Sequence, residues 1–548
     1  SYTPAWHTHA KLFRVSIATS IARPARKGHT AAPGRHTRPA PPAPRPYVWT
    51  SSDTISTAII AVLAFITRFV GLTSPVSEGT PVFDEKHYVP QAWDMVSSWH
   101  NLFLGGIESN PGYGLVVHPP LAKQIVALSE SVFGYTPMGW RFMTALFGVG
   151  TVLLTMALAR RLSGSWHVGF LAGLIAVCDG VLLVSSKFGM LDIFQVFFVV
   201  AAAWALARDH QQMRERLHTA FITGAMGTSD FGPRFGFRWW RFTAGVFLGL
   251  TLSVKWSGLY YIMFFGLMSV FSDLALRRMY GVRRYVLGTL IRDTPAALAS
   301  IVVLPIALYA WSWRAWFADE TAVYRHAKVD GTIDEGSWLL NLPEPIAGWF
   351  YYHSSVLEFH ASLTSSGGHS HPWDSKPWAW LVAARPILYY SSTDLTCPNG
   401  GDCRKMLYLF GTPAIWWLVI PAVLWGLWSL LVRRNRAFLI PLVGAAAGFL
   451  PWLMVFDRQM YFFYATAFIP FVIVLIALAC GQMIGRGPEL RWPWLRSIFG
   501  STMPLGTFLT VCYAALVVAM FAYFSPILYG FLIPESWYQS MMWLPSWS

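Results

Sequence analysis

The chain has 548 residues, of which 55% are hydrophobic and only 12% are charged. A soluble protein carries roughly 25% charged residues, so this composition excludes an ordinary soluble domain and indicates an all-α polytopic membrane protein. The formal net charge of +14 could suggest nucleic acid. We instead expect the basic residues to lie in loops near anionic lipid headgroups, with no nucleic-acid partner.

The first 50 residues form a distinct segment. They are rich in Pro, Ala, Arg and His, show no apolar period, and lack the apolar core of a cleavable signal peptide. We therefore predict a flexible basic cytoplasmic tail over residues 1–50. Residues 51–548 are expected to form one transmembrane domain.

Apolar stretches long enough to cross a bilayer recur along this second part. We predict about eleven transmembrane helices, at residues 53–73, 139–159, 165–185, 190–207, 241–254, 257–276, 295–316, 409–431, 437–456, 461–483 and 503–525. With the N-terminus inside, about two thirds of the Lys and Arg residues fall on the cytoplasmic side, as such residues usually do. The pattern favours a cytoplasmic N-terminus and an outer C-terminus.

Two long loops then lie on the outer face, at residues 74–138 and 317–408. Both are rich in Trp, Tyr, His and Pro, so we expect them to fold against the membrane surface and to carry the function. Residues 89–104 have apolar positions near helical spacing, which favours an interfacial helix resting on lipid.

The five cysteines fall into two groups. Cys178, Cys480 and Cys512 lie in apolar spans, where small packing residues are expected. Cys397 and Cys403 flank a turn-rich segment of the second outer loop. A disulfide could close this turn in an oxidising compartment, although spacing alone leaves the pairing open.

Ionisable residues at or near the outer ends of the spans are few, and isolated charges near hydrocarbon are functional by default. They are Asp84, Glu85, Arg141, Lys187, Asp192, Lys255, Asp457 and Arg458, with His353, His371 and Arg385 in the second loop. A carboxylate can act as a general base, and cations can stabilise a departing phosphate. The combination fits transfer of a sugar from a lipid-linked phosphate.

Six ordered motifs make this specific. They are FDEKHY at 83–88, VHPPLAK at 117–123, GMLD at 189–192, SVKWSG at 253–258, HPW at 371–373 continuing through WAW at 378–380 to RP at 385–386, and MYFFY at 460–464. In these motifs the chain resembles the protein O-mannosyltransferases, which use polyprenyl-phosphate-mannose and have the GT-C membrane glycosyltransferase fold. The resemblance implies transfer of mannose, with inversion, to Ser or Thr of secreted or membrane proteins.

Carried over to this chain, the resemblance assigns the acidic pair to catalysis. Asp84 is expected to be the general base, with Glu85 orienting the acceptor or sharing the role. The alternative is structural, because Asp is also favoured at the N-cap of a helix and Asp84 follows Pro81-Val82-Phe83.

For the donor phosphate we nominate Lys255 and Arg141, with Arg385 and His371 as further candidates. Lys255 lies between two apolar spans, where a structural ammonium would need a buried carboxylate partner and an anionic ligand could replace one. Arg141 could instead extend to the interface or pair with Asp192.

Other residues are assigned supporting roles. Lys187 and Asp192 could belong to the site or simply form a salt bridge, and His353 and Arg458 could assist in the second half of the chain. His118 precedes two prolines, which favours a structural role. Aromatic residues of the second loop could form an interfacial belt or stack on a sugar: Trp373, Trp378, Trp380, Tyr389 and Tyr390.

One departure from the pattern of eukaryotic relatives indicates the kind of organism and the donor lipid. Loop 317–408 leaves no room for the β-trefoil MIR domain of eukaryotic relatives, which favours an actinobacterial plasma-membrane enzyme with a bacterial polyprenyl donor. No carboxylate cluster resembles a cation cage, so we predict a reaction without metal or cofactor. The acceptor proteins could be delivered by the translocation machinery.

Two other functions remain open. Another GT-C enzyme could move a sugar onto a lipid or a cell-wall glycan. A transporter is more remote, because transporters have internal repeats and charges near midspan, and neither is evident in this sequence.

Overall fold

The computed structural model describes residues 41–75, 79–101, 103–108, 117–499 and 502–548. The chain divides into two compact units, Ser1–Pro41 and Pro42–Ser548. Almost all of the first unit, and with it most of the tail predicted over residues 1–50, lies outside the described residues. The second unit contains the elements of the fold and the candidate site.

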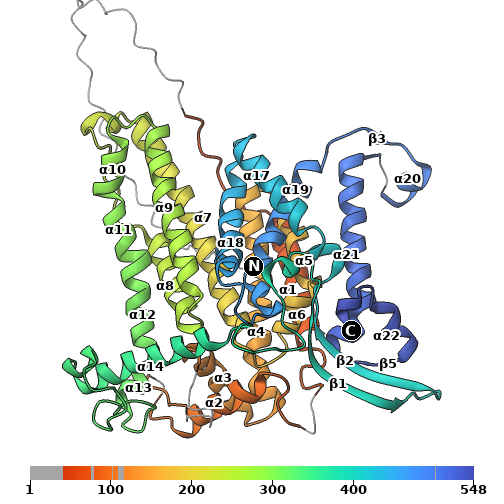
Figure 1. Ribbon diagram of the computed structural model, residues 1–548. Helices are drawn as coiled ribbons and strands as arrows, with labels where there is room; N and C mark the ends of the chain where they lie inside the picture. The colour runs from red at the N-terminus through yellow and green to blue at the C-terminus, as the bar shows by residue number, and fades with distance from the viewer. Residues whose placement is uncertain (1–40, 76–78, 102, 109–116, 500–501) are drawn as a thin grey trace, which may run out of the picture. The chain divides into compact units, whose positions relative to one another are not determined.

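The second unit is a bundle of roughly parallel helices (Figure 1). Among the described residues, eight helical segments are long and apolar enough to cross a membrane. They are α1 (Ser51–Phe69), α4 (Pro137–Ser163), α7 (Asp192–Ile222), α9 (Gly258–Met279), α11 to α12 (Thr294–Ser312), α16 to α17 (Pro413–Leu431), η4 to η5 (Arg436–Met454) and α21 (Leu505–Tyr529).

The three other predicted spans coincide with shorter helices. These are α5 (Trp166–Cys178), followed by α6 (Gly180–Ser185), then α8 (Trp239–Val254) and α19 (Ile469–Met483). Every predicted span therefore contains a helix, but the number of eleven transmembrane helices is not confirmed.

The ends of the helices follow local sequence signals. Thr50 and Asp53 form a capping box at the start of α1, in which the Thr50 backbone N–H donates to Asp53 Oδ2 at 2.8 Å. Thr136 accepts from the Gly139 N–H at 3.2 Å and precedes a proline at the first position of α4. Gly164 ends α4 in the left-handed region.

Helices lying across one end of the bundle form what we call the cap layer (Figure 1): α2 (Glu85–Ser97), α3 (Leu121–Phe133), α13 (Arg314–Ala318) and α14 (Glu344–Ser362). The helix predicted at 89–104 is α2, but it begins earlier and ends at Ser97. The Asn101 side chain accepts from the N–H groups of Phe103 and Leu104 at 2.9 and 3.0 Å. This local turn replaces helical bonding and explains the earlier end.

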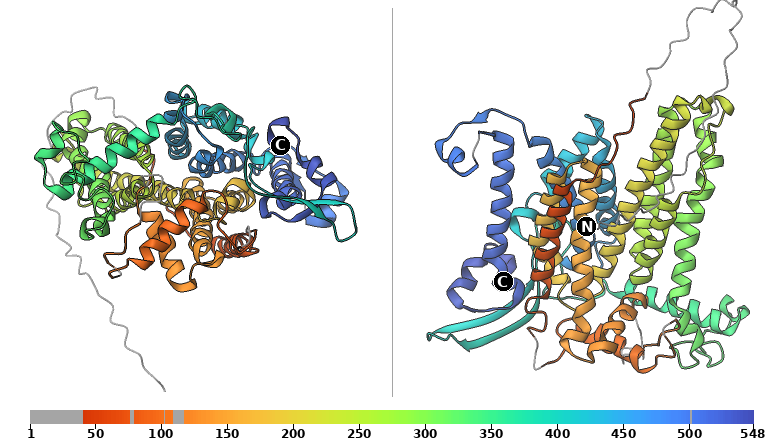
Figure 2. Two further views of the ribbon diagram at one scale, coloured as in Figure 1. Left: turned by 60° about the horizontal axis from the view of Figure 1, so that its bottom comes forward. Right: turned by 180° about the vertical axis from the view of Figure 1, so that it is seen from behind.

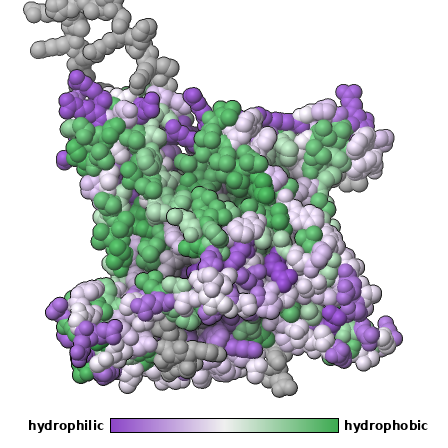
Figure 3. Space-filling view, viewed as in Figure 1, coloured by the Kyte–Doolittle hydropathy of each residue, from purple (hydrophilic) through white to green (hydrophobic). Residues whose placement is uncertain are grey.

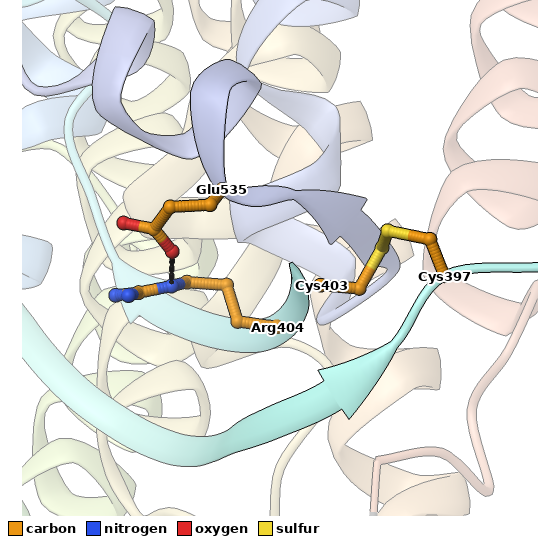
Figure 4. The surroundings of a disulfide bond; sticks show 4 residues. All are labelled: Cys397, Cys403, Arg404 and Glu535. Atoms are coloured by element: carbon orange, nitrogen blue, oxygen red, sulfur yellow. Dashed lines mark ion pairs between the residues drawn. A yellow bond between two sulfur atoms is a disulfide. The ribbon is translucent and has the colours of Figure 1, made fainter. Parts of the chain in front are cut away.

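The all-α prediction missed a small antiparallel sheet of order β1-β2-β5, formed by β1 (Ile387–Thr396), β2 (Asp402–Leu409) and β5 (Leu532–Pro534). The hairpin β1–β2 lies at the same end of the bundle as the cap layer, as the views from two sides show (Figures 1 and 2). A Cys397–Cys403 disulfide closes its turn, with the two Cα atoms 5.2 Å apart, so the bridge that the sequence left open is present (Figure 4). Arg404 of β2 pairs with Glu535 of α22 (Glu535–Met541).

The remaining elements are short and connect these layers. They are η1 (Ala225–Thr228), α10 (Tyr285–Arg292), η3 (Trp338–Asn341), α15 (Pro377–Trp380), η6 (Phe462–Ala467), β3 (Glu489–Leu490), α20 (Pro493–Phe499), β4 (Met503–Pro504) and η7 (Pro545–Trp547).

The core and the outer surface of the bundle are both apolar. Residues 469–478 of α19 are all buried, as are Cys178 and Cys480. Cys512 is exposed on α21, so its predicted packing role is wrong. A hydrophobic band crosses the face seen in Figure 3, and hydrophilic residues gather towards both ends of the helices. An exposed apolar band with polar ends is what a bilayer requires.

Candidate active site

A cavity of about 850 Å³ lies where the cap layer meets the bundle. It is bounded by the loop before α2, the start of α7, the turn between α8 and α9, the inner face of α14, and residues 458–467. Its charged and imidazole side chains are Asp84, His87, His118, Asp192, Lys255, His353, His360 and Arg458. Leu252, Leu259 and Ala447 add apolar walls. The cavity therefore has both ionisable and apolar lining residues.

Asp84 is the carboxylate of this cavity that forms no hydrogen bond to any described residue. It precedes α2 at the N-cap position, yet its side chain makes no capping bond. Burial raises the pKa of its carboxyl group to about 6, against the attraction of His87 and Lys255. Asp84 therefore has the N-cap position that the structural alternative expected, but its side chain does not cap the helix. A carboxylate with a raised pKa and free acceptor atoms suits a general base.

Glu85 and Arg141 are fully buried and face each other behind the cavity. Arg141 Nε and Nη2 donate to Glu85 Oε1 and Oε2 at 2.8 and 2.9 Å. Glu85 also accepts from the N–H groups of Val82 at 3.0 Å and Gly189 at 2.7 Å. Neither residue lines the cavity, in contrast to the expected acceptor and phosphate contacts. Each charge is neutralised by the other.

Lys255 and Asp192 form a second pair, within the cavity wall. Lys255 Nζ donates to Asp192 Oδ1 at 2.7 Å. Asp192 is thus the buried carboxylate partner that a structural ammonium would need, and a role for Lys255 at the donor phosphate stays a prediction. The alternative pairings of Asp192 with Arg141 or Lys187 do not occur, because Asp192 is bonded to Lys255.

Arg458 is the cavity cation that has no carboxylate partner among the described residues. One of its N–H groups faces His360 Nδ1 at 3.1 Å, while His360 Nε2 lies 3.3 Å from the Val117 carbonyl oxygen. Burial, and then the Arg458 charge, lower the pKa of His360 to about 4. The imidazole is therefore neutral at pH 7, and the Arg458 charge remains available to an anion.

Sequence reasoning missed His360, although a signal for it existed. His353 and His360 are seven residues apart on α14, which is two helical turns, so both face the same side of that helix. Both line the cavity. His353 Nδ1 lies 2.6 Å from the Trp349 carbonyl oxygen, and its Nε2 lies 2.6 Å from the Tyr309 hydroxyl.

His118 also lines the cavity. Burial lowers the pKa of its imidazole well below the usual value. Pro120 is the N-cap of α3, so the two prolines after His118 lead into a helix of the cap layer and not directly into a membrane span.

Three nominated cations or histidines lie outside the cavity. Lys187 Nζ donates to the carbonyl oxygens of Arg68 and Val70 at the end of α1. Arg385 donates to the Ser546 carbonyl at 2.7 Å. His371 accepts from the Trp373 N–H at 3.2 Å, and its ring lies 5.3 Å from that of Tyr461, a residue of the cavity wall. Only His371 is therefore near the cavity.

Metal ligands do not cluster in the described ranges. Across them, no three His, Cys, Asp or Glu side chains come close enough together to hold a metal ion.

The helical bundle has the GT-C fold. The structure of the S. cerevisiae protein O-mannosyltransferase Pmt1-Pmt2 complex bound to the sugar donor matches with a TM-score of 0.65 at 15% identity, over 91% of this chain and 93% of that chain.

Sequence comparison gives the family. The family model described as dolichyl-phosphate-mannose-protein mannosyltransferase matches residues 58–315, and that of the C-terminal four TMM region of protein-O-mannosyltransferase matches residues 345–547. Relatives called polyprenol-phosphate-mannose–protein mannosyltransferase share 66% identity in Corynebacterium glutamicum (92% of this chain, 96% of the relative) and 44% in Mycobacterium tuberculosis (90% and 91%). The chain belongs to the protein O-mannosyltransferase family.

Proposed function

We propose that this chain transfers mannose from polyprenol-phosphate-mannose to Ser or Thr hydroxyl groups of proteins, with Asp84 as the general base. The substrates are those in the names of the relatives. The observation that carries the assignment of the base is the Asp84 carboxylate, which no described residue bonds and which shares a cavity with Arg458, a cation without a carboxylate partner in the described part of the chain.

The reaction is a single displacement. The acceptor hydroxyl attacks the anomeric carbon while Asp84 takes its proton, and the bond from that carbon to the phosphate oxygen breaks. Attack on the face opposite the leaving group inverts the anomeric carbon. The released polyprenyl phosphate keeps the electron pair of the broken bond, so charge stabilisation at its oxygen lowers the barrier.

Arg458 is our first candidate for this stabilisation. Its neighbour His360 is neutral at pH 7, so the guanidinium can donate several charge-assisted bonds to a phosphate. Lys255 contributes less net charge because Asp192 neutralises it. The apolar walls from Leu252, Leu259 and Ala447 suit the first units of the polyprenyl chain.

The test is mannose transfer to a Ser/Thr-rich peptide by the purified full-length protein. We expect Asp84→Asn to lower the rate by about 10²- to 10⁴-fold, the usual contribution of a general base, and to retain donor binding. Glu358→Gln is the matched control, because Glu358 is an exposed acid of α14 that does not line the cavity. Undiminished transfer by Asp84→Asn would refute the base. Turnover onto a lipid or glycan, without peptide transfer, would support the alternative GT-C function.

The phosphate contact has its own test in the same assay. We expect Arg458→Gln to raise the donor KM at least tenfold, because a charge-assisted bond is lost. Arg325→Gln is the control, since Arg325 pairs with Glu320 of the loop before α14 and lies outside the cavity. An unchanged donor KM in Arg458→Gln would return the phosphate to Lys255.

We further propose that the reaction needs no metal ion or cofactor. Of the two cavity carboxylates, Asp192 is bound to Lys255, so Asp84 alone would hold a divalent ion weakly. Transfer should survive EDTA; loss with EDTA and recovery with magnesium or manganese would contradict this.

The cellular setting is part of the proposal. We place the protein in the plasma membrane, with a cytoplasmic N-terminus and with the cavity and C-terminus on the outer face. Acceptor proteins could then be presented as they leave the translocation machinery.

A further inference from the structure

An aromatic cluster includes Phe83, the residue that precedes Asp84 in the chain. The ring of Tyr389, near the start of β1, stacks on that of Phe83 with centroids 4.4 Å apart and planes 13° from parallel. Its other neighbour is Phe188, whose ring it meets edge-on at 5.9 Å. Tyr389 is only 6% exposed, so the stack is part of the interior.

Phe83 has an unusual backbone, with a φ of +49°. Bulky residues rarely occupy this left-handed region, and the conformation persists only where the surroundings enforce it. Phe83 immediately precedes Asp84 in the chain. A return of Phe83 to negative φ would turn the next peptide and move the Asp84 carboxylate within the cavity.

Hydrogen bonds to the last residues of the chain hold residues 383–385, the segment that precedes the strand of Tyr389. Trp547 is fully buried, and its Nε1 donates to the Ala383 carbonyl at 3.0 Å. Ser546 donates to the Ala384 carbonyl, and Arg385 donates back to the Ser546 carbonyl at 2.7 Å. Residues 383–385 are thereby tied to η7, and β1 begins two residues later.

The far side of the stack is also anchored. The Arg141 guanidinium lies 4.4 Å from the centre of the Phe188 ring and is bonded to Glu85. Tyr389 is thus held between the C-terminal segment on one side and the buried Glu85–Arg141 ion pair on the other.

We propose that Tyr389 is a positioning residue for Asp84: its ring, held by the C-terminal segment, stacks on Phe83 and maintains the left-handed backbone that aims the Asp84 carboxylate into the cavity. The inference rests on the proposed role of Asp84 as the base. The ring rather than the hydroxyl is responsible, because the Tyr389 hydroxyl forms no hydrogen bond to a described residue.

Loss of the stack should also alter the pH profile, because burial sets the raised pKa of Asp84. The titratable and charged groups that face Asp84 are His87 and Tyr88 of α2, Asp192 at the start of α7, Lys255 of the α8–α9 turn, Tyr389 of β1, and Tyr461 and Tyr464 near η6. Apart from Tyr389 itself, they remain in a variant without the stack. Water admitted beside Asp84 would then lower its pKa towards 3.8 and shift the acidic limb of kcat to lower pH.

The experiment compares Tyr389→Leu, Tyr389→Phe and Phe83→Gly in the full-length protein. We expect Tyr389→Leu to lower kcat by about 10- to 100-fold, the effect of a small misplacement at a reacting group, with little change in donor KM. Tyr389→Phe keeps the ring and should stay within about threefold of wild type. Glycine tolerates positive φ but cannot stack, so Phe83→Gly should lower kcat as Tyr389→Leu does.

A double-mutant cycle tests the route. If Tyr389 acts through Phe83, the double variant should be no slower than the slower single variant, whereas independent effects on kcat would multiply. Tyr408→Leu is the control: Tyr408 is a buried aromatic of β2 that bonds to Tyr538 and makes no ring contact with Phe83. It should lower the Tm without moving the pH profile.

Three results would overturn the proposal. They are wild-type kcat and pH profile in Tyr389→Leu, equal loss in Tyr389→Phe, and multiplied effects in the double variant. Asp84→Asn is assayed alongside: if it remains active, the base itself is wrong, whereas if it is inactive while Tyr389→Leu is normal, only the positioning role fails.

Discussion

At the scale of single residues, two adjacent carboxylates have opposite environments. The Asp84 side chain lines the cavity, and its carboxylate accepts no hydrogen bond from a described residue. Glu85 has its oxygens bonded to Arg141 and to two backbone N–H groups. One carboxylate is therefore open to the cavity and the other is held in a buried ion pair, although the two are adjacent in the sequence.

The first prediction concerns pH and stability. The folded state raises the pKa of Asp84 from 3.8 to about 6, so the ionised carboxylate destabilises the fold above that pH. Stability contributed by this group falls as pH rises through about 4 to 6. Asp84→Asn should therefore raise the free energy of unfolding at pH 7.5 by at most about 3 kcal/mol, and the Tm should rise with it. At pH 4 the substitution should change the Tm little. Transfer by wild type should decline below about pH 6. A lower Tm for the variant at pH 7.5 would contradict this assignment.

The second prediction concerns Glu85. Removing one member of a buried ion pair leaves an uncompensated charge, which costs about 3–5 kcal/mol. Glu85→Gln should therefore lower the Tm strongly, and Arg141→Gln should do the same. If Glu85→Gln instead kept the wild-type Tm and donor binding but lost transfer, Glu85 would contact the acceptor directly.

At the scale of elements, α14 lines the cavity, and the β1–β2 hairpin contacts the loop that carries Asp84. The helix presents His353 and His360 to the cavity on one face. The hairpin contributes Tyr389 at its base, while its disulfide closes the distant turn. No residue from 387 to 409 lines the cavity, so the base and the turn of the hairpin should be separable in experiments.

The third prediction follows for the disulfide. Replacing both Cys397 and Cys403 with serine opens a loop of sequence separation 6, which costs about 2 kcal/mol in the chain-entropy estimate. Hydrogen exchange should speed up in the hairpin turn, while mannose transfer stays near wild type. Cys512→Ser, at an exposed free cysteine, is the control. Loss of transfer in the double serine variant would show that the turn itself supports the site.

At the scale of the whole membrane unit, charges gather at both ends of the bundle. Away from the cavity, Arg238 Nη1 lies 2.6 Å from Asp273 Oδ2, and Arg277 Nε lies 2.5 Å from Asp293 Oδ2. These pairs link α8, α9 and the α10–α11 junction, and they explain buried charges that sequence reasoning did not assign. Because they are paired, they indicate bracing of the helices rather than a polar pathway across the membrane.

The fourth prediction concerns orientation. Thr393 is exposed in the hairpin, and Thr228 is exposed in η1 between α7 and α8. In a Cys512→Ser background, an impermeant maleimide should label Thr393→Cys in intact cells, and Thr228→Cys only after permeabilisation. The reverse pattern would invert the proposed topology and place the cavity on the cytoplasmic side.

Composition and local pattern were sufficient to predict the membrane class and a helix in each predicted span, and short motifs indicated the family and singled out Asp84; the disulfide was only a possibility. These properties depend on hydrophobic length and on short motifs, which neighbouring residues determine. Cys512 shows the limit: an apolar span is recognisable, but the side of its helix that faces outwards is not.

The partners of charges were decided only by the tertiary structure. Glu85 and Arg141 are 56 residues apart in sequence, and Lys255 and Asp192 are 63 apart. Whether a cation is free for phosphate depends on a carboxylate that folding brings within hydrogen-bond distance, and no local pattern encodes that distance. The sequence by itself determined that this is a membrane protein of the protein O-mannosyltransferase family. The packing of distant helices decided that Arg458 has no carboxylate partner among the described residues and that Glu85 supports the loop of its neighbour.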